Sequence, residues 1–215
     1  MSTGPIPMLR ILTNNANPIY TLCIPGRKGV IGMTPCPGIR LESARRGNVQ
    51  KNLRRDLAAC QQWGASGIVT FNETDEPHGL GVGDLGDQVL SGGMWWRQMP
   101  ISDMDIPEDS FEDNWAVESK QIITSLVAGE RVVLHCLAGL GRTGMMAARL
   151  LVDMGMAPAL AVAEVRKVRP RAIQTDDQEK YIYEHSSRGS RWTGDQTGKG
   201  PYATTPRGSI RGLVT

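Results

Sequence analysis

The stretch of sequence that decides the fold is HCLAGLGRTG, residues 135–144. It overlaps RVVLHC, residues 131–136, a largely apolar run that is typical of a buried strand. Apolar residues then recur at helical spacing from about Arg142 to Asp153. A glycine-rich turn between a buried strand and a helix directs backbone N–H groups and the positive end of the helix to one place. The stretch therefore predicts an anion site, and phosphate suits it.

Outside this stretch, strand-like and helix-like segments alternate along the chain. The strand-like runs cover residues 19–24, 29–33, 67–71 and 94–99. Helical patterns mark residues 48–63, 84–90, 110–128, 158–168 and 175–185, with Ser110 as the expected N-cap of the third. The alternation predicts an α/β fold with a mostly parallel central sheet flanked by helices.

The two ends of the chain differ in composition from the middle. Residues 186–215 hold six glycines and five basic residues against one acid, and they are poor in apolar residues. Such a segment cannot offset its ordering entropy by burial. We expect a disordered, basic, glycine-rich tail over residues 186–215, a flexible N-terminus over residues 1–17 and one domain over residues 18–185.

Charge and cysteine usage exclude several classes of protein. The 24 basic and 22 acidic residues give a net charge of +2, so no nucleic-acid partner is predicted. The longest apolar stretch, residues 145–162, is interrupted by Arg149 and Asp153, far short of the ~20 apolar residues of a membrane span. The four cysteines form no Cys-x-x-Cys pair, which predicts neither disulfides nor zinc, and no other metal or cofactor is expected. A reducing, cytoplasmic location is the expectation.

The loop also supplies the residue types that phosphoryl chemistry needs. Cys136 lies where a helix end and a cation favour the reactive thiolate. Arg142 carries a planar fork that can bind two phosphoryl oxygens at once. The residues expected to bind phosphate are Leu137, Ala138, Gly139, Leu140, Gly141 and Arg142.

The run resembles the signature loop of the cysteine-dependent tyrosine and dual-specificity phosphatases. Four further patches, residues 36–38, 45–51, 100–103 and 172–175, are similar to the kinase-associated, cyclin-dependent kinase inhibitor-type branch. The resemblance spans about residues 35–185. It implies a protein-tyrosine-phosphatase-like fold and a reaction through a cysteinyl-phosphate formed on Cys136, which water then hydrolyses.

The resemblance also implies roles for other side chains. Asp103 is the expected general acid, and Asp105, two residues on, is the alternative. Four residues are expected to support them, namely His135 by orienting the loop, Thr143 by steadying the leaving thiolate, and Gln174 or Gln178 by positioning water. Arg45 and Arg46 are candidates for binding acidic groups of the substrate, although paired arginines are more often solvated.

The uncharged side chains of Leu137, Ala138 and Leu140 favour a phosphoprotein or phosphopeptide partner with one phosphate, phosphotyrosine ahead of phosphoserine or phosphothreonine. Phosphoinositides and RNA 5′ phosphates remain alternatives, as does a catalytically silent phosphate-binding module. Residues 139–144 and 81–86 also spell G-x-G-x-x-G, the fingerprint of dinucleotide-binding oxidoreductases. No strand with a ribose-binding acid follows at the required spacing of about 20 residues. The sequence leaves the oligomeric state open.

Overall fold

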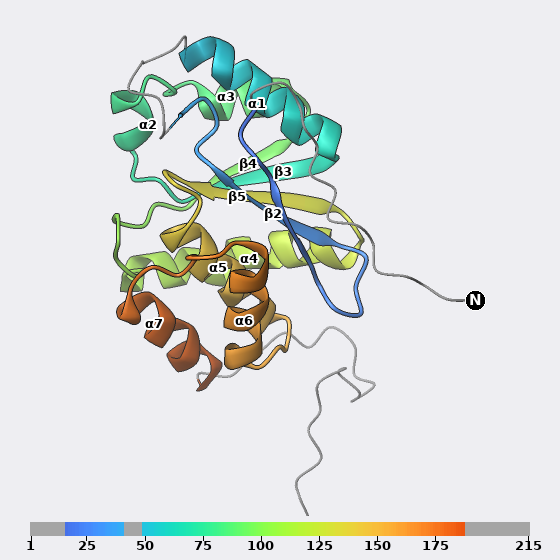
Figure 1. Ribbon diagram of the computed structural model, residues 1–215, viewed down its shortest axis with the longest axis vertical. Helices are drawn as coiled ribbons and strands as arrows, with labels where there is room; N and C mark the ends of the chain where they lie inside the picture. The colour runs from blue at the N-terminus through green and yellow to red at the C-terminus, as the bar shows by residue number, and fades with distance from the viewer. Residues whose placement is uncertain (1–15, 41–48, 188–215) are drawn as a thin grey trace, which may run out of the picture.

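A five-stranded sheet forms the centre of the molecule in the computed structural model, which describes residues 16–40 and 49–187 (Figure 1). Its strands are β1 (Tyr20–Cys23), β2 (Val30–Pro35), β3 (Ala65–Thr70), β4 (Trp95–Gln98) and β5 (Arg131–Cys136). They lie in the order β1-β2-β5-β3-β4, with β1 antiparallel to β2 and every other pair parallel. The predicted α/β fold with a mostly parallel sheet is confirmed.

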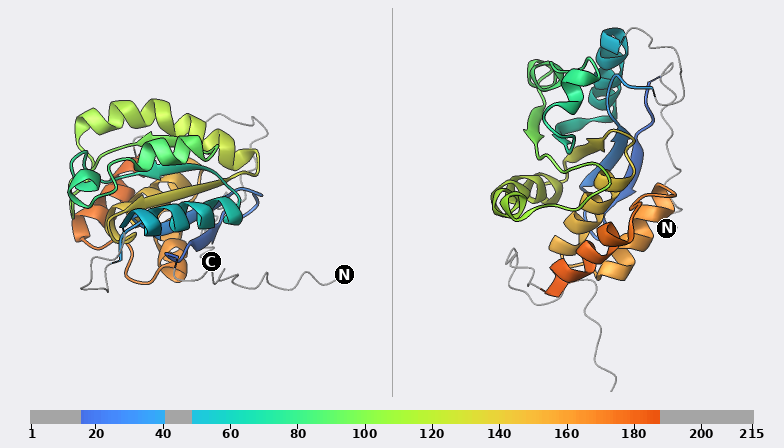
Figure 2. Two further views of the ribbon diagram at one scale, coloured as in Figure 1. Left: turned by 90° about the horizontal axis from the view of Figure 1, so that it is seen from above. Right: turned by 90° about the vertical axis from the view of Figure 1, so that its left-hand side faces the viewer.

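Helices cover both faces of this sheet (Figures 1 and 2). On one face lie α1 (Val49–Trp63), α2 (Glu76–Gly79) and α3 (Leu85–Ser91), and on the other α4 (Asp109–Val127), α5 (Gly141–Asp153), α6 (Pro158–Val168) and α7 (Asp176–Ser187). Each face has its own apolar cluster. Leu53, Trp63 and Val89 belong to the first cluster, and Trp115 and Leu150 belong to the second.

The central position of β5 decides where the loop after it lies. β5 pairs with β2 on one side and β3 on the other, and Val132, Val133 and Leu134 are fully buried. Pro35 on β2 is the register partner of Cys136. Because parallel strands end at the same edge of a sheet, the segments that follow β2, β3 and β4 all approach the loop after β5.

Most expected elements match the structure to within one or two residues, one expectation is wrong, and one short helix was not expected. The N-cap of α4 is Glu108, so Ser110 lies inside the first helical turn rather than before it. The glycine-rich connection after β3 contains the short helix α2, with Pro77 in its first turn, which no periodicity predicted because four residues are too few to show one.

The expected domain boundaries fall close to the limits of the described chain. Residues 1–15 and nearly all of the predicted basic tail lie outside the described residues. Asn17, at the end of the expected N-terminal segment, donates hydrogen bonds to Asp56 and to the carbonyls of Cys36 and Ile39. Helix α7 runs to Ser187. Within residues 16–40 and 49–187, every helix is too short or too polar to cross a membrane.

Candidate active site

The loop between β5 and α5 depends on glycines at two positions. Gly139 has a φ of 65°, and a Cβ there would lie 2.4 Å from the carbonyl oxygen of Thr34. A Cβ on Gly144 would lie 2.8 Å from the Cβ of Ala172. Larger residues would therefore push the loop away from β2 and from the segment that follows α6.

Four successive carbonyl groups of this loop are turned outward and accept hydrogen bonds: those of Leu137, Ala138, Gly139 and Leu140. The N–H of Cys36, just after β2, donates to the carbonyl of Leu137 at 3.0 Å. Arg169, just after α6, donates to the carbonyls of Ala138 and Gly139. In a trans peptide the N–H points away from the carbonyl, so the N–H groups of this loop face the other side. The loop thus offers an anion a set of donors at the end of β5.

Arg142 lies beneath this loop with its side chain 1% exposed. Its Nη1 donates to Glu76 Oε1 at 2.5 Å and to the carbonyl of Ile101 at 2.9 Å, and its Nη2 lies 2.9 Å from Asp103 Oδ1. Its Nε has no partner among the described residues, which leaves one donor of the fork for an anion. Burial alone would lower the pKa of Arg142, but Glu76, Cys136 and Asp103 outweigh burial and raise it, so the guanidinium stays charged.

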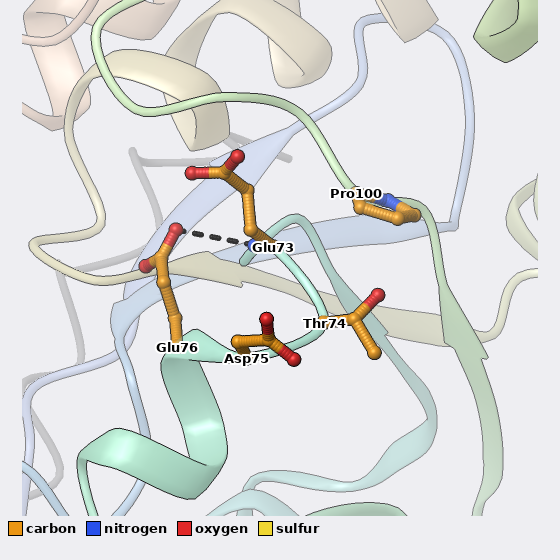
Figure 3. Close-up of a pocket in the computed structure, with 5 residues that line it drawn as sticks. All are labelled: Glu73, Thr74, Asp75, Glu76 and Pro100. Atoms are coloured by element: carbon orange, nitrogen blue, oxygen red, sulfur yellow. Dashed lines mark hydrogen bonds between the residues drawn. The ribbon is translucent and has the colours of Figure 1, made fainter.

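Glu76, which the sequence analysis missed, holds the other side of this arginine. Its carboxylate accepts hydrogen bonds from Arg142 and from Asn72. It also accepts one from the backbone N–H of Glu73 (Figure 3). Burial favours its neutral form, yet these hydrogen bonds lower the pKa of Glu76 below its usual value. One signal in the sequence could have indicated Glu76. It lies six residues after the end of β3, which runs parallel to β5, so it lies at the same edge of the sheet as the loop after β5.

The two candidate acids occupy different environments in the segment after β4. Asp103 is 58% exposed and reaches Arg142. Asp105 instead accepts a hydrogen bond from the N–H of Ile106 at 2.8 Å, and its own N–H donates to the carbonyl of Ser102. The geometry brings Asp103, and not Asp105, to the arginine of the loop.

Both candidate glutamines lie over the start of α5. A Cβ on Gly141 would lie 2.9 Å from Gln174 Oε1 and 3.1 Å from the side chain of Gln178. Gln174 is exposed. Gln178 is fully buried, and its Nε2 donates to the carbonyl of Asp105 at 3.2 Å. Gln178 therefore connects α7 to the segment that carries Asp103.

His135 and Thr143 are both fully buried. The Nε2 of His135 lies 2.7 Å from Thr70 Oγ1, and this hydroxyl oxygen accepts a hydrogen bond from the indole N–H of Trp96. Burial lowers the pKa of His135 to about 4, so the ring is neutral near pH 7. The Oγ1 of Thr143 has no partner in the described part of the chain.

An acidic hollow of about 520 Å³ lies beside this site. Glu73, Thr74, Asp75, Glu76 and Pro100 line it (Figure 3). The described residues contain no group of three or more His, Cys, Asp or Glu side chains that could hold a metal ion. Arg45 and Arg46, the candidates for binding acidic groups of a substrate, lie outside the described residues.

The sheet order and the loop between β5 and α5 define the protein-tyrosine-phosphatase-like fold class. The family model for DSP-PTPase phosphatases of polymorphic toxin systems matches residues 45–156. The chain therefore belongs to this family of dual-specificity and tyrosine phosphatases, and the resemblance seen in the sequence is confirmed.

Relatives in sequence and structure agree with this assignment. The cyclin-dependent kinase inhibitor 3 of Rattus norvegicus is 27% identical over 157 residues, which cover 72% of this chain and 70% of the relative. The protein of the same name from Homo sapiens is 29% identical over the same shares. A crystal structure of kinase-associated phosphatase, with serine at its catalytic-site cysteine, has a TM-score of 0.71 at 24% identity and covers 82% of this chain and 97% of that one. The structural match shows the fold.

Proposed function

We propose that this chain hydrolyses phosphomonoesters on proteins, with phosphotyrosine ahead of phosphoserine and phosphothreonine, through a cysteinyl-phosphate on Cys136. One observation carries the proposal. Cys136 lies at the end of the central strand. The loop that follows it has outward-facing carbonyls and an arginine, Arg142, that is buried and charged. Such a loop stabilises the negative charge of a transferring phosphoryl group.

The side chains around the loop fit the two steps of this reaction. In the first step Cys136 Sγ attacks phosphorus, and Asp103 protonates the leaving oxygen as its bond to phosphorus breaks. In the second step Asp103 takes a proton from the water that attacks the cysteinyl-phosphate, and the thiolate leaves. Thr143, whose buried hydroxyl has no partner in the described chain, fits a role in stabilising that thiolate. Gln174, exposed over the start of α5, fits the role of positioning the water.

The charges around the site favour a protein substrate over a polyanion. Arg142 is the only basic residue between positions 136 and 144, and the hollow beside it is lined by Glu73, Asp75 and Glu76. These carboxylates would repel the additional phosphates of a phosphoinositide or of RNA. A phosphoprotein with a single phosphate near the loop has no additional phosphates for these carboxylates to repel. A cytoplasmic location, where the four cysteines would stay reduced, accords with this proposal.

Hydrolysis of an aryl phosphate without added metal tests the proposed activity. We expect Cys136→Ser to abolish turnover and to keep tungstate binding, because an alcohol is not ionised near neutral pH. Arg142→Lys should lower kcat/KM by about 10²–10³, because lysine keeps the charge but loses the fork. Arg97→Lys is the matched control, since Arg97 pairs with Glu118 on the surface.

Two results would contradict the proposal. Tungstate binding by the parent protein without any turnover would assign the chain to the phosphate-binding modules. Turnover that survives Cys136→Ser would exclude the covalent route.

A second experiment decides the substrate class. It compares kcat/KM for phosphopeptides that differ only in Tyr, Ser or Thr with kcat/KM for a phosphoinositide and for a 5′-phosphorylated RNA.

A further inference from the structure

The side chain of Arg169 contacts the phosphate-binding loop from outside. Its Nε lies 3.4 Å from the carbonyl oxygen of Gly139, and its Nη2 lies 3.3 Å from that of Ala138. Its guanidinium also lies over the ring of Tyr20 on β1, 4.1 Å from the ring centroid. The arginine is thus held between β1 and two successive peptide groups of the loop.

Arg169 begins the α6–α7 turn, which we define as residues 169–173. This turn contains two non-glycine residues in the left-handed region, Arg171 with φ 70° and Ile173 with φ 61°. Ile173 is buried and β-branched, so this conformation costs of order 1–3 kcal/mol and persists only where the surroundings enforce it. The N–H of Ile173 donates to the carbonyl of Leu140 at 3.2 Å. The strained turn therefore contacts the third of three successive loop carbonyls.

We infer that the α6–α7 turn, through Arg169, is the element that keeps the loop in its anion-binding form, and that Arg169 is a positioning residue for the proposed reaction. Three adjacent peptide groups have their carbonyls bound by this turn, those of Ala138, Gly139 and Leu140. Each bond fixes the direction of the N–H in the same peptide plane. Without Arg169, two of these planes lose their outer partner and can rotate, which turns an acceptor toward the anion.

The same chain offers a matched control for this role. Arg131, the first residue of β5, also binds a backbone carbonyl and an aromatic ring: its Nη1 donates to the carbonyl of Trp63 at 2.8 Å, and its guanidinium lies 5.3 Å from the centroid of the Trp63 ring. It lies at the opposite end of the strand from the loop. Arg169→Ala and Arg131→Ala therefore each remove a guanidinium that binds backbone and a ring, and only the first removes contacts to the phosphate-binding loop.

The experiment measures tungstate affinity, kcat and KM for an aryl phosphate, and the melting temperature of each variant. We expect Arg169→Ala to weaken tungstate binding and to lower kcat/KM by about 10- to 100-fold, as a small misplacement of donors does. Arg131→Ala should change both by less than about 3-fold at a comparable loss of melting temperature. Arg169→Lys should recover only part of the loss, because one ammonium does not reproduce a fork that spans two carbonyls.

Equal losses in Arg169→Ala and Arg131→Ala would overturn the inference and show a general effect on stability. Full activity and full tungstate affinity in Arg169→Lys would also overturn it, since charge alone would then suffice. The inference rests on the same site as the proposed function, but tungstate binding separates the two. If the parent protein binds tungstate in an Arg169-dependent way and hydrolyses no ester, the proposed function fails and the role of Arg169 stands.

Discussion

The Oδ1 of Asp103 lies 2.9 Å from Nη2 of Arg142. The carboxylate thus lies against the guanidinium that we propose binds the phosphoryl group, and we propose it as the general acid. We expect Asp103→Asn to slow hydrolysis of aryl phosphates with poor leaving groups by about 10²–10⁴. The rates of Asp103→Asn and of the parent protein are measured over a series of aryl phosphates. The two rates should become equal for leaving groups that depart without a proton.

Asp105→Asn is the control for this prediction. The Asp105 carboxylate binds the N–H of Ile106, so its loss should alter the local turn and leave the leaving-group dependence unchanged. A steep leaving-group dependence in Asp105→Asn together with a shallow one in Asp103→Asn would reverse the assignment of the acid.

Glu76 is predicted to matter through Arg142 rather than through contact with substrate. Glu76→Gln removes the charge that pairs with both Nη atoms, while the amide keeps the shape of the side chain. We expect kcat/KM for an aryl phosphate to fall by about 10- to 100-fold, because the fork of Arg142 loses its orientation. Glu118→Gln on α4, which breaks the ion pair with Arg97 on β4, should change kcat/KM by less than about 2-fold. Similar values for the two variants would exclude the positioning role.

The contiguous part of this site follows from the sequence pattern, Asp103 and the two glutamines were expected only through the family resemblance, and Glu76 and Arg169 were not expected. Cys136, the loop and Arg142 are contiguous, and the strand and helix that carry them have clear apolar patterns. Glu76 and Arg169 come from elements 60 residues before and 33 residues after the cysteine. The position of Glu76 after a parallel strand points to the sheet edge but not to its partner Arg142, and the carbonyls that Arg169 binds leave no trace in residue spacing. Only the order of the strands and the path of the α6–α7 turn bring these residues to the loop.

Glu112 is predicted to control stability at acid pH. Burial alone would raise the pKa of Glu112, but the His185 ring 3.2 Å away, the hydrogen bond from the Tyr181 hydroxyl and the charge of Arg149 lower it to about 2. A carboxylate whose pKa is lower in the folded chain stabilises it above the usual pKa of 4.5, and this contribution is lost as pH falls from 4.5 toward 2. Melting temperatures measured across that window should fall less steeply for Glu112→Gln than for the parent protein. Glu164→Gln, whose partner Lys167 is exposed, should follow the parent. Parallel curves for Glu112→Gln and the parent would refute this assignment.

Met104 is predicted to be a site where glycine stabilises the protein. Met104 has a φ of 61° in the turn that the N–H of Asp105 closes onto the carbonyl of Ser102. Its side chain is 49% exposed, so packing offsets little of the strain that a non-glycine residue has in the left-handed region. We expect Met104→Gly to raise the free energy of unfolding by up to about 1 kcal/mol, because the relief of strain exceeds the entropy that glycine adds to the unfolded chain. Leu160→Gly, at a residue of 36% exposure in α6, should lower it by about 1 kcal/mol, because glycine is unfavourable within a helix. Denaturant unfolding of both variants measures the sign of each change in the free energy of unfolding. A loss of stability in Met104→Gly as large as that in Leu160→Gly would show that the turn at Met104 is not strained.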